Sequence, residues 1–139
     1  MSSDAIADVY LEGPADLTLV DAVHDALADL WSRVPEVSDE DRMLFALAVS
    51  EVATNVVEHA EGPEHPTVTI RLEVDATTLT AVMTDDADPA LIRLDRVTMP
   101  GEDAESGRGL ALALAALDDL QHDPTHGNVW LLRRRRRDV

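Results

Sequence analysis

Three polar side chains stand at regular intervals in an apolar segment, LFALAVSEVATNVVEHA, at residues 44–60. Glu51, Asn55 and His59 are four residues apart, so on a helix each is rotated by only about 40° from the one before. Asn55 and His59 fall inside the apolar arc of this helix, and Glu51 lies at its edge. A polar group buried without a partner costs about 1–3 kcal/mol. The spacing therefore predicts a polar partner opposite this helix, either a hydrogen-bonding loop or a bound polar ligand.

Two later segments carry groups that suit a polar ligand. Carboxylates cluster in the sequence VMTDDADPALI, residues 82–92, directly after a predicted strand. The sequence SGRG then places Gly107 and Gly109 at the start of a predicted helix. Glycines there let backbone N–H groups approach a phosphate, and the helix dipole favours the anion. Glycine also opens many helices for steric reasons alone, so this pair indicates a phosphate site only together with the other segments.

In this order, the segments resemble the GHKL (Bergerat-fold) ATPase superfamily, and within it the anti-sigma-factor and serine-protein kinase branch of bacterial partner-switching regulators. Glu51, Asn55 and His59 are similar to the N-box of that family. Residues 85–89 are similar to its first glycine box, and residues 107–110 to its second. The similarity extends over nearly the whole chain, from about residue 15 to residue 135.

The resemblance implies ATP and Mg²⁺ as cofactors. It implies that Asn55 holds the Mg²⁺, a role that suits an amide oxygen and a hard cation. It implies that Glu51 is the catalytic residue that orients or deprotonates the attacking hydroxyl, and that Asp85 accepts a hydrogen bond from the adenine amino group. The other positions that it implies in cofactor binding are His59, Ala87, Pro89, Gly107, Arg108, Gly109 and Leu110.

The function implied is a serine/threonine protein kinase that phosphorylates a small antagonist protein and sequesters a sigma factor. Two departures from the family pattern favour nucleotide binding over efficient phosphate transfer. Ala87 stands where the family usually has glycine, and Glu105 stands where many relatives carry a basic residue, whereas Pro89 replaces the second glycine as it does in other members of the branch. The alternative is a non-catalytic module in which ATP sets the affinity for a partner. A stand-alone relative of histidine-kinase catalytic domains is disfavoured, because no phosphoacceptor helix precedes the segment.

The chain must provide helices and strands that bring these residues together. Ser38, followed by three acidic residues, is a good N-cap for the helix that carries Glu51. The predicted helices and strands segregate along the chain, which favours a single α+β domain over residues 1–139. We expect a two-layer α/β sandwich, with a mixed, mostly antiparallel sheet and three helices on one face. The predicted strands are 5–11, 66–74, 79–83, 120–122 and 128–132, and the predicted helices are 16–32, 38–60 and 109–120.

Composition restricts the function further. The chain of 139 residues has a net charge of −17, which argues against nucleic acid as a direct partner. It has no cysteine, and so neither disulfides nor thiolate metal sites. No apolar run is long enough to span a membrane, so we expect a cytoplasmic protein. Five consecutive arginines at 133–137 are either a docking patch or a solvated strand end. A homodimer is compatible with the resemblance.

Overall fold

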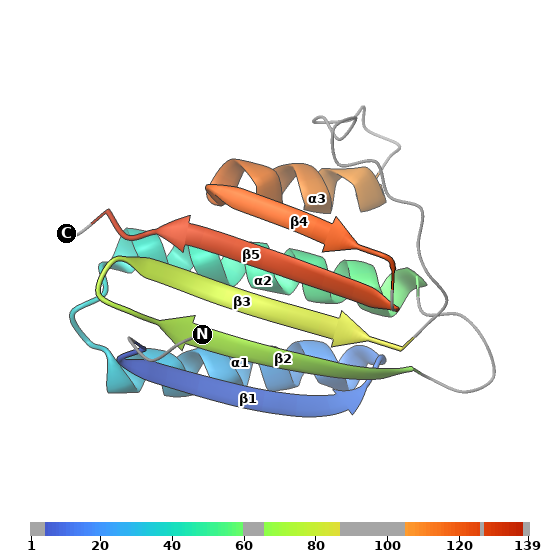
Figure 1. Ribbon diagram of the computed structural model, residues 1–139, viewed down its shortest axis with the longest axis horizontal. Helices are drawn as coiled ribbons and strands as arrows, with labels where there is room; N and C mark the ends of the chain where they lie inside the picture. Colours follow the sequence, from blue (N-terminus) through green and yellow to red (C-terminus); the bar gives the residue numbers. More distant parts are fainter. Residues whose placement is uncertain (1–4, 60–65, 87–104, 126, 138–139) are drawn as a thin grey trace.

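The computed structural model describes residues 5–59, 66–86, 105–125 and 127–137, with the side chains of residues 105–107 excepted. Five strands form one sheet in the order β1-β2-β3-β5-β4. All three helices cover the same face of this sheet (Figure 1). In chain order the elements are β1 (Ala7–Pro14), α1 (Leu17–Arg33), α2 (Asp39–His59), β2 (Thr67–Val74), β3 (Thr78–Asp85), α3 (Glu105–Ala116), β4 (Asp119–Asp123) and β5 (Asn128–Arg135).

This architecture confirms the predicted two-layer α+β sandwich. The four strand pairings that connect the sheet are all antiparallel, where the sequence predicted a mixed sheet. Alternation along the strands produces the core, because every second residue points to the helix layer. Ile70 and Met83 lie opposite each other on β2 and β3, and both are fully buried. Trp130 on β5, 1% exposed, extends this core beneath the helices.

The helix that carries Glu51 begins as the sequence predicts. Its first residue is Asp39, and the Oγ of Ser38 accepts a hydrogen bond from the backbone N–H of Asp41 at 3.1 Å. This satisfies one of the N–H groups that a helix start leaves without an intrahelical partner. The cap fixes where α2 begins. The regular periodicity of the helix then sets the directions in which Glu51 and Asn55 point.

The third helix differs from the prediction at both ends. It runs from Glu105 to Ala116, whereas the sequence predicted residues 109–120. Leu120, which the sequence placed both at the end of this helix and at the start of the strand 120–122, belongs to β4, where it pairs with Leu132 of β5. The backbone N–H of Asp118 already donates to the carbonyl of Arg133 at 2.9 Å, so the chain leaves the helix for the sheet before that point. The apolar periodicity of this segment is compatible with both helix and strand, and the pairing with β5 decides between them.

The arginine run is not a uniformly solvated strand end. Arg134 and Arg136 are only 4% and 5% exposed, because alternate residues at the end of β5 point into the protein. Arg134 pairs with the fully buried Asp41 of α2, with 3.0 Å between its Nη2 and Oδ1, and donates from Nη1 to the carbonyl of Ala116 at 2.9 Å. Arg136 donates to the carbonyl of Asp75. These two arginines tie β5 to α2, α3 and the β2–β3 turn.

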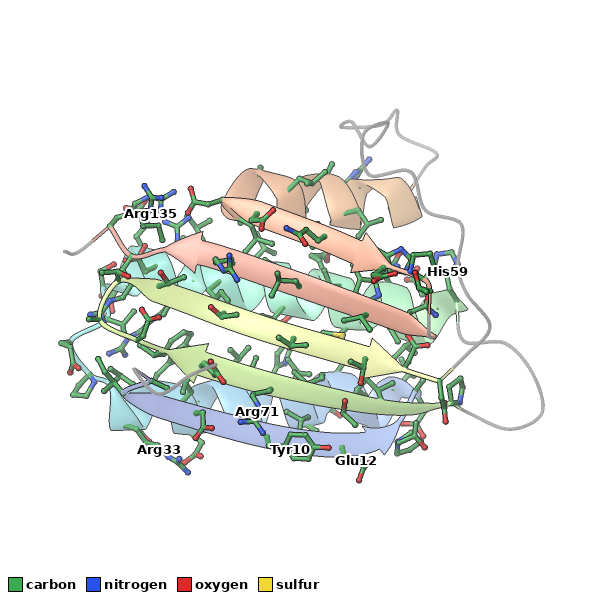
Figure 2. The ribbon with its side chains drawn as sticks, viewed as in Figure 1. Tyr10, Glu12, Arg33, His59, Arg71 and Arg135 are labelled. Carbon is green, nitrogen blue, oxygen red and sulfur yellow. The ribbon has the colours of Figure 1, made fainter. Side chains whose placement is uncertain are left out.

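The opposite face of the sheet has no helix over it among the described residues. Tyr10 and Arg71 lie there on neighbouring strands (Figure 2), with the guanidinium carbon of Arg71 5.9 Å from the centre of the Tyr10 ring. This face is separated from Glu51 and Asn55 by the full thickness of the sheet, because α2 packs on the other side (Figure 1).

Candidate nucleotide site

Glu51 and Gly109 meet where α2 packs against α3. A Cβ atom placed on Gly109 would lie 3.0 Å from Oε2 of Glu51, closer than nine in ten real Cβ contacts. The absence of a side chain at Gly109 therefore makes room for the half-buried carboxylate of Glu51. The structure brings together two of the predicted site residues, one from the segment similar to the N-box and one from the second glycine box.

Asn55 lies one turn further along α2 and is 6% exposed. Its side-chain amide makes no hydrogen bond to the residues that the structure describes. No side-chain nitrogen or oxygen in the described residues is fully enclosed without a partner, so this amide must reach solvent-accessible space. The structure thus shows a mostly buried amide that keeps some access to solvent.

His59 does not share this environment. Its side chain is exposed, whereas its position on the helical wheel predicted an apolar surrounding. It is the last residue of α2 and lies at the C-terminal end of this helix (Figure 2). The apolar arc that encloses Asn55 ends before the last turn, so His59 belongs to the rim of any site built around Asn55.

The second glycine box lies inside α3 rather than before it. Gly107 is in the first turn, whose N–H groups have no carbonyl partner within the helix. Gly109 and Leu110 come a turn later, where N–H groups donate to carbonyls four residues earlier. Arg108 is exposed, and Leu110 is 6% exposed and part of the core. In this helix Gly107 has the backbone N–H best placed for an anion, while Gly109 admits the Glu51 carboxylate.

Asp85 ends β3 and is 8% exposed. Its Oδ1 accepts a hydrogen bond from Nδ2 of Asn128 at 2.9 Å. The Oδ1 of Asn128 lies 2.8 Å from Nε2 of His122 on β4. The His122 ring in turn packs on Trp130, with 4.3 Å between the ring centres. A continuous polar chain therefore leads from Asp85 across β5 to β4.

Gly127 makes the close approach of these strands possible. Its φ of +82° lies in the region that favours glycine, and a Cβ there would be 2.5 Å from the carbonyl oxygen of Asp85. The sequence analysis did not assign Asn128, His122 or Gly127 to the site. The available signal was the sequence HGN, in which a glycine is followed at once by an asparagine and an apolar strand.

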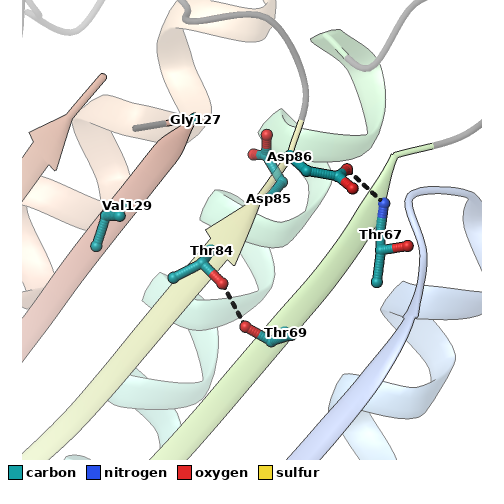
Figure 3. Close-up of a pocket in the computed structure, with 7 residues that line it drawn as sticks. All are labelled: Thr67, Thr69, Thr84, Asp85, Asp86, Gly127 and Val129. Carbon is teal, nitrogen blue, oxygen red and sulfur yellow. Dashed lines mark hydrogen bonds between the residues drawn. The ribbon is translucent and has the colours of Figure 1, made fainter. Parts of the chain in front are cut away.

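A cavity of about 540 Å³ opens at the ends of β2, β3 and β5 (Figure 3). The described residues that line it are Thr67, Thr69, Thr84, Asp85, Asp86, Gly127 and Val129. Thr69, Thr84 and Val129 alternate with core residues, so the cavity lies on the face of the sheet that α2 and α3 do not cover. Asp85 borders this cavity, whereas Glu51 and Asn55 do not. The cavity therefore does not include the surroundings of Asn55.

Two predicted cofactor contacts, Ala87 and Pro89, lie outside the described residues. Within the described residues, no group of three or more His, Asp or Glu side chains could hold a metal ion. A Mg²⁺ at Asn55 would therefore take most of its oxygen ligands from phosphates and water, which is how this ion is usually bound. The accessible amide of Asn55 fits that role. None of the helices described here is both long and apolar enough to cross a membrane.

Comparison with known proteins identifies the class. Residues 13–133 match the family described as the histidine kinase-like ATPase domain, and the chain belongs to this family. Domains of this family bind ATP, typically with Mg²⁺, and are of the kinase or ATPase kind. The match confirms the predicted superfamily and leaves its anti-sigma-factor branch a prediction.

A solved structure agrees with this assignment at the level of the fold. The histidine kinase domain of the blue-light activated histidine kinase EL346 from Erythrobacter litoralis superimposes with a TM-score of 0.54 at 15% sequence identity. The alignment covers 87% of this chain and 60% of that one. The chain thus spans about three fifths of the length of this relative. No curated protein matches the sequence.

Proposed function

We propose that the protein binds ATP with Mg²⁺ between α2 and α3, with Asn55 as the protein ligand of the metal. The observation that carries this proposal is the Asn55 amide, which is 6% exposed, has no hydrogen-bond partner among the described residues and still reaches solvent. Water can reach such a group only in part, so a ligand that uses the amide oxygen would satisfy it better than solvent does. Family membership supports ATP as that ligand.

Asp85 is the residue that reads the adenine in this proposal. Although the residue borders the cavity on the open face, its side chain alternates with that of Thr84 and so points to the face that carries α2, where Asn128 holds the carboxylate. A carboxylate that accepts a hydrogen bond from the exocyclic amino group of adenine discriminates against guanine, which presents a carbonyl there. The N–H of Gly107, in the open first turn of α3, serves the phosphates.

The activity that we propose is phosphate transfer to a serine or threonine of a small antagonist protein. Glu51 acts as the base that takes the proton of the attacking hydroxyl. Its half-buried carboxylate makes no hydrogen bond to the described residues, and Gly109 leaves space beside it. Phosphoryl transfer needs mainly positioning and charge stabilisation, which Mg²⁺ and a few donors can supply. Sequestration of a sigma factor by the nucleotide-bound protein completes the proposal.

A non-catalytic, nucleotide-gated binding module is the second candidate. Glu105 favours it, because the residue opens α3 at the turn where a basic residue would help to neutralise the transferred phosphate. In this version, ATP sets the affinity of the protein for its partner and no phosphate is transferred.

The substitution Glu51→Gln separates the two candidates. The amide has nearly the same shape but cannot take a proton, so transfer should fall by about 10²–10⁴-fold while ATP affinity stays within a few-fold. Glu58→Gln, an exposed position on the same helix, is the matched control and should leave both unchanged. The assay follows labelled phosphate from ATP to an antagonist protein that co-purifies with the chain. Absence of any transfer by the unmodified protein would reject the kinase and retain the binding module.

A further inference from the structure

We infer that Asn128 and His122 position the Asp85 carboxylate and thereby set the preference of the site for adenine over guanine. The inference rests on the proposed function, in which Asp85 reads the purine. It assigns a role to two residues on β5 and β4, one of which lies on the strand at the edge of the sheet. Neither residue belongs to the segments that carry the family resemblance.

The contacts form one chain across three strands. Asp85 and Asn128 are directly opposite in the β3–β5 pairing, and Asn128 Nδ2 donates to Asp85 Oδ1 at 2.9 Å. His122 is directly opposite Trp130 in the β4–β5 pairing, which places its ring diagonally next to Asn128. The resulting distance from His122 Nε2 to Asn128 Oδ1 is 2.8 Å. Asn128 is 4% exposed, so its amide depends on these protein partners more than on water.

The direction of each hydrogen bond follows from the chemistry of the groups. An ionised carboxylate only accepts, so the NH₂ group of Asn128 must face Asp85. The amide oxygen then faces His122, whose Nε2 must carry a proton in order to donate to it. Both the neutral ring protonated at Nε2 and the imidazolium satisfy this requirement. Asp85 and His122 therefore favour the same orientation of the Asn128 amide, one at each end of the group.

Loss of the His122 donor would remove one of these two constraints. The Asn128 amide would then be held by fewer hydrogen bonds and could shift away from the geometry in which its NH₂ group meets Asp85 Oδ1. The carboxylate would be held less firmly, and its alignment toward an exocyclic amino group would be weaker. Trp130 keeps the imidazole in place in the native protein, because it is 1% exposed and packs on the ring.

The test compares the binding of ATP and GTP, each with Mg²⁺, by isothermal titration calorimetry. His122→Phe keeps an aromatic ring on Trp130 but removes the donor, and we expect the ratio of ATP to GTP affinity to fall roughly 5- to 10-fold, the effect of one hydrogen bond. His122→Gln restores a side-chain N–H donor and should recover most of the ratio. Asn128→Ala should lower the ratio at least as much as His122→Phe. Gln121→Ala, an exposed neighbour on β4, is the control and should leave the ratio unchanged.

The outcomes separate this inference from the proposed function. If the unmodified protein binds neither nucleotide, the proposed function fails, and the role inferred for Asn128 and His122 fails with it. If ATP binds but His122→Phe and Asn128→Ala lower the affinities for ATP and GTP equally, or not at all, only the role inferred for Asn128 and His122 is overturned. A readout without nucleotide is the ¹⁵N NMR spectrum of His122, in which we expect Nε2 to carry a proton at neutral pH. A ring protonated only at Nδ1 would overturn the inference directly.

Discussion

Gly109 of α3 faces the carboxylate of Glu51 on α2 so closely that a methyl group at position 109 would lie 3.0 Å from Oε2. The neighbour is the end of a flexible side chain, so a larger residue would displace the carboxylate and leave the helix backbones in place. The glycine therefore contributes to the position of the proposed base. This role adds to the phosphate approach that the sequence pattern indicated for the same residue.

The substitution Gly109→Ala should separate these effects. Alanine is more favourable than glycine within a helix by up to about 1 kcal/mol, so the melting temperature should stay the same or rise. Transfer of phosphate should fall, because the new methyl group moves the Glu51 carboxylate. Thermal melting and the transfer assay measure the two effects. A clear drop in melting temperature would show instead that Gly109 serves the packing of α2 against α3.

Gly13→Ala provides the control for that experiment. A Cβ at Gly13 would meet no atom within 4 Å, and the residue lies on β1, away from α2 and α3. We expect no change in transfer. If transfer also fell in this variant, the loss in Gly109→Ala could not be attributed to Glu51.

Asn55→Leu should stabilise the protein and abolish its function. Leucine has a similar size and replaces a mostly buried amide, which has no partner among the described residues and only partial access to solvent, by an apolar side chain. The melting temperature of the nucleotide-free protein should therefore rise, while Mg²⁺-dependent ATP binding disappears. Melting curves with and without MgATP measure both. A variant that melts lower and still binds MgATP would show that Asn55 is a structural residue.

Arg134→Ala should be among the most destabilising single substitutions in this domain. It would leave the fully buried Asp41 carboxylate without its guanidinium, and such a loss costs about 3–5 kcal/mol. The neighbouring Arg133→Ala removes an exposed side chain of the same kind and should change the stability little. Urea unfolding of the two variants measures the difference. Equal stabilities would contradict the role assigned to the buried pair.

Stability should also depend on Asp118 at acid pH. The side-chain hydrogen bond from Arg137, followed by the backbone N–H of Arg135, lowers the pKa of Asp118 from 3.8 to about 2. Because the folded-state pKa is depressed, the stabilisation is fully present above the unfolded value and is lost as the pH falls through the folded one. Asp118→Asn should thus be less stable than the unmodified protein at pH 5, and the gap should close toward pH 2. A gap that stays constant over this range would contradict the assignment.

The local signals in the sequence predicted most of the fold. The cap at Ser38, the alternation along β2 and β3 and the helical spacing of α1 and α2 are confirmed, since each depends on residues close in sequence. The predicted C-terminal end of α3 was wrong, because the pairing of β4 with β5, in which Leu120 lies opposite Leu132, decides where the helix stops. Arg134 and Arg136 were assigned to the surface, because their buried environment depends on Asp41 and Asp75, far away in the chain.

For the candidate site too, residues on a single helix could be predicted from the sequence, whereas contacts between separate elements could not. Glu51 and Asn55 could be predicted from helical periodicity, because both lie on one helix. The contact of Glu51 with Gly109 and the chain from Asp85 to Asn128 and His122 join separate elements. No spacing within one segment reveals such contacts. His59 was assigned to the apolar arc by the same periodicity, which does not show where that arc ends.

Calorimetric titration of the purified protein with ATP, with and without Mg²⁺, tests the central claim most directly. The accessible amide of Asn55 and the family membership predict saturable binding at ATP concentrations below about 1 mM, and a marked weakening when Mg²⁺ is removed. Asn55→Leu should lower the affinity for ATP in the presence of Mg²⁺ to the value seen without the ion, or below it. Absence of binding at millimolar ATP with Mg²⁺, in a protein shown to be folded, would contradict the account.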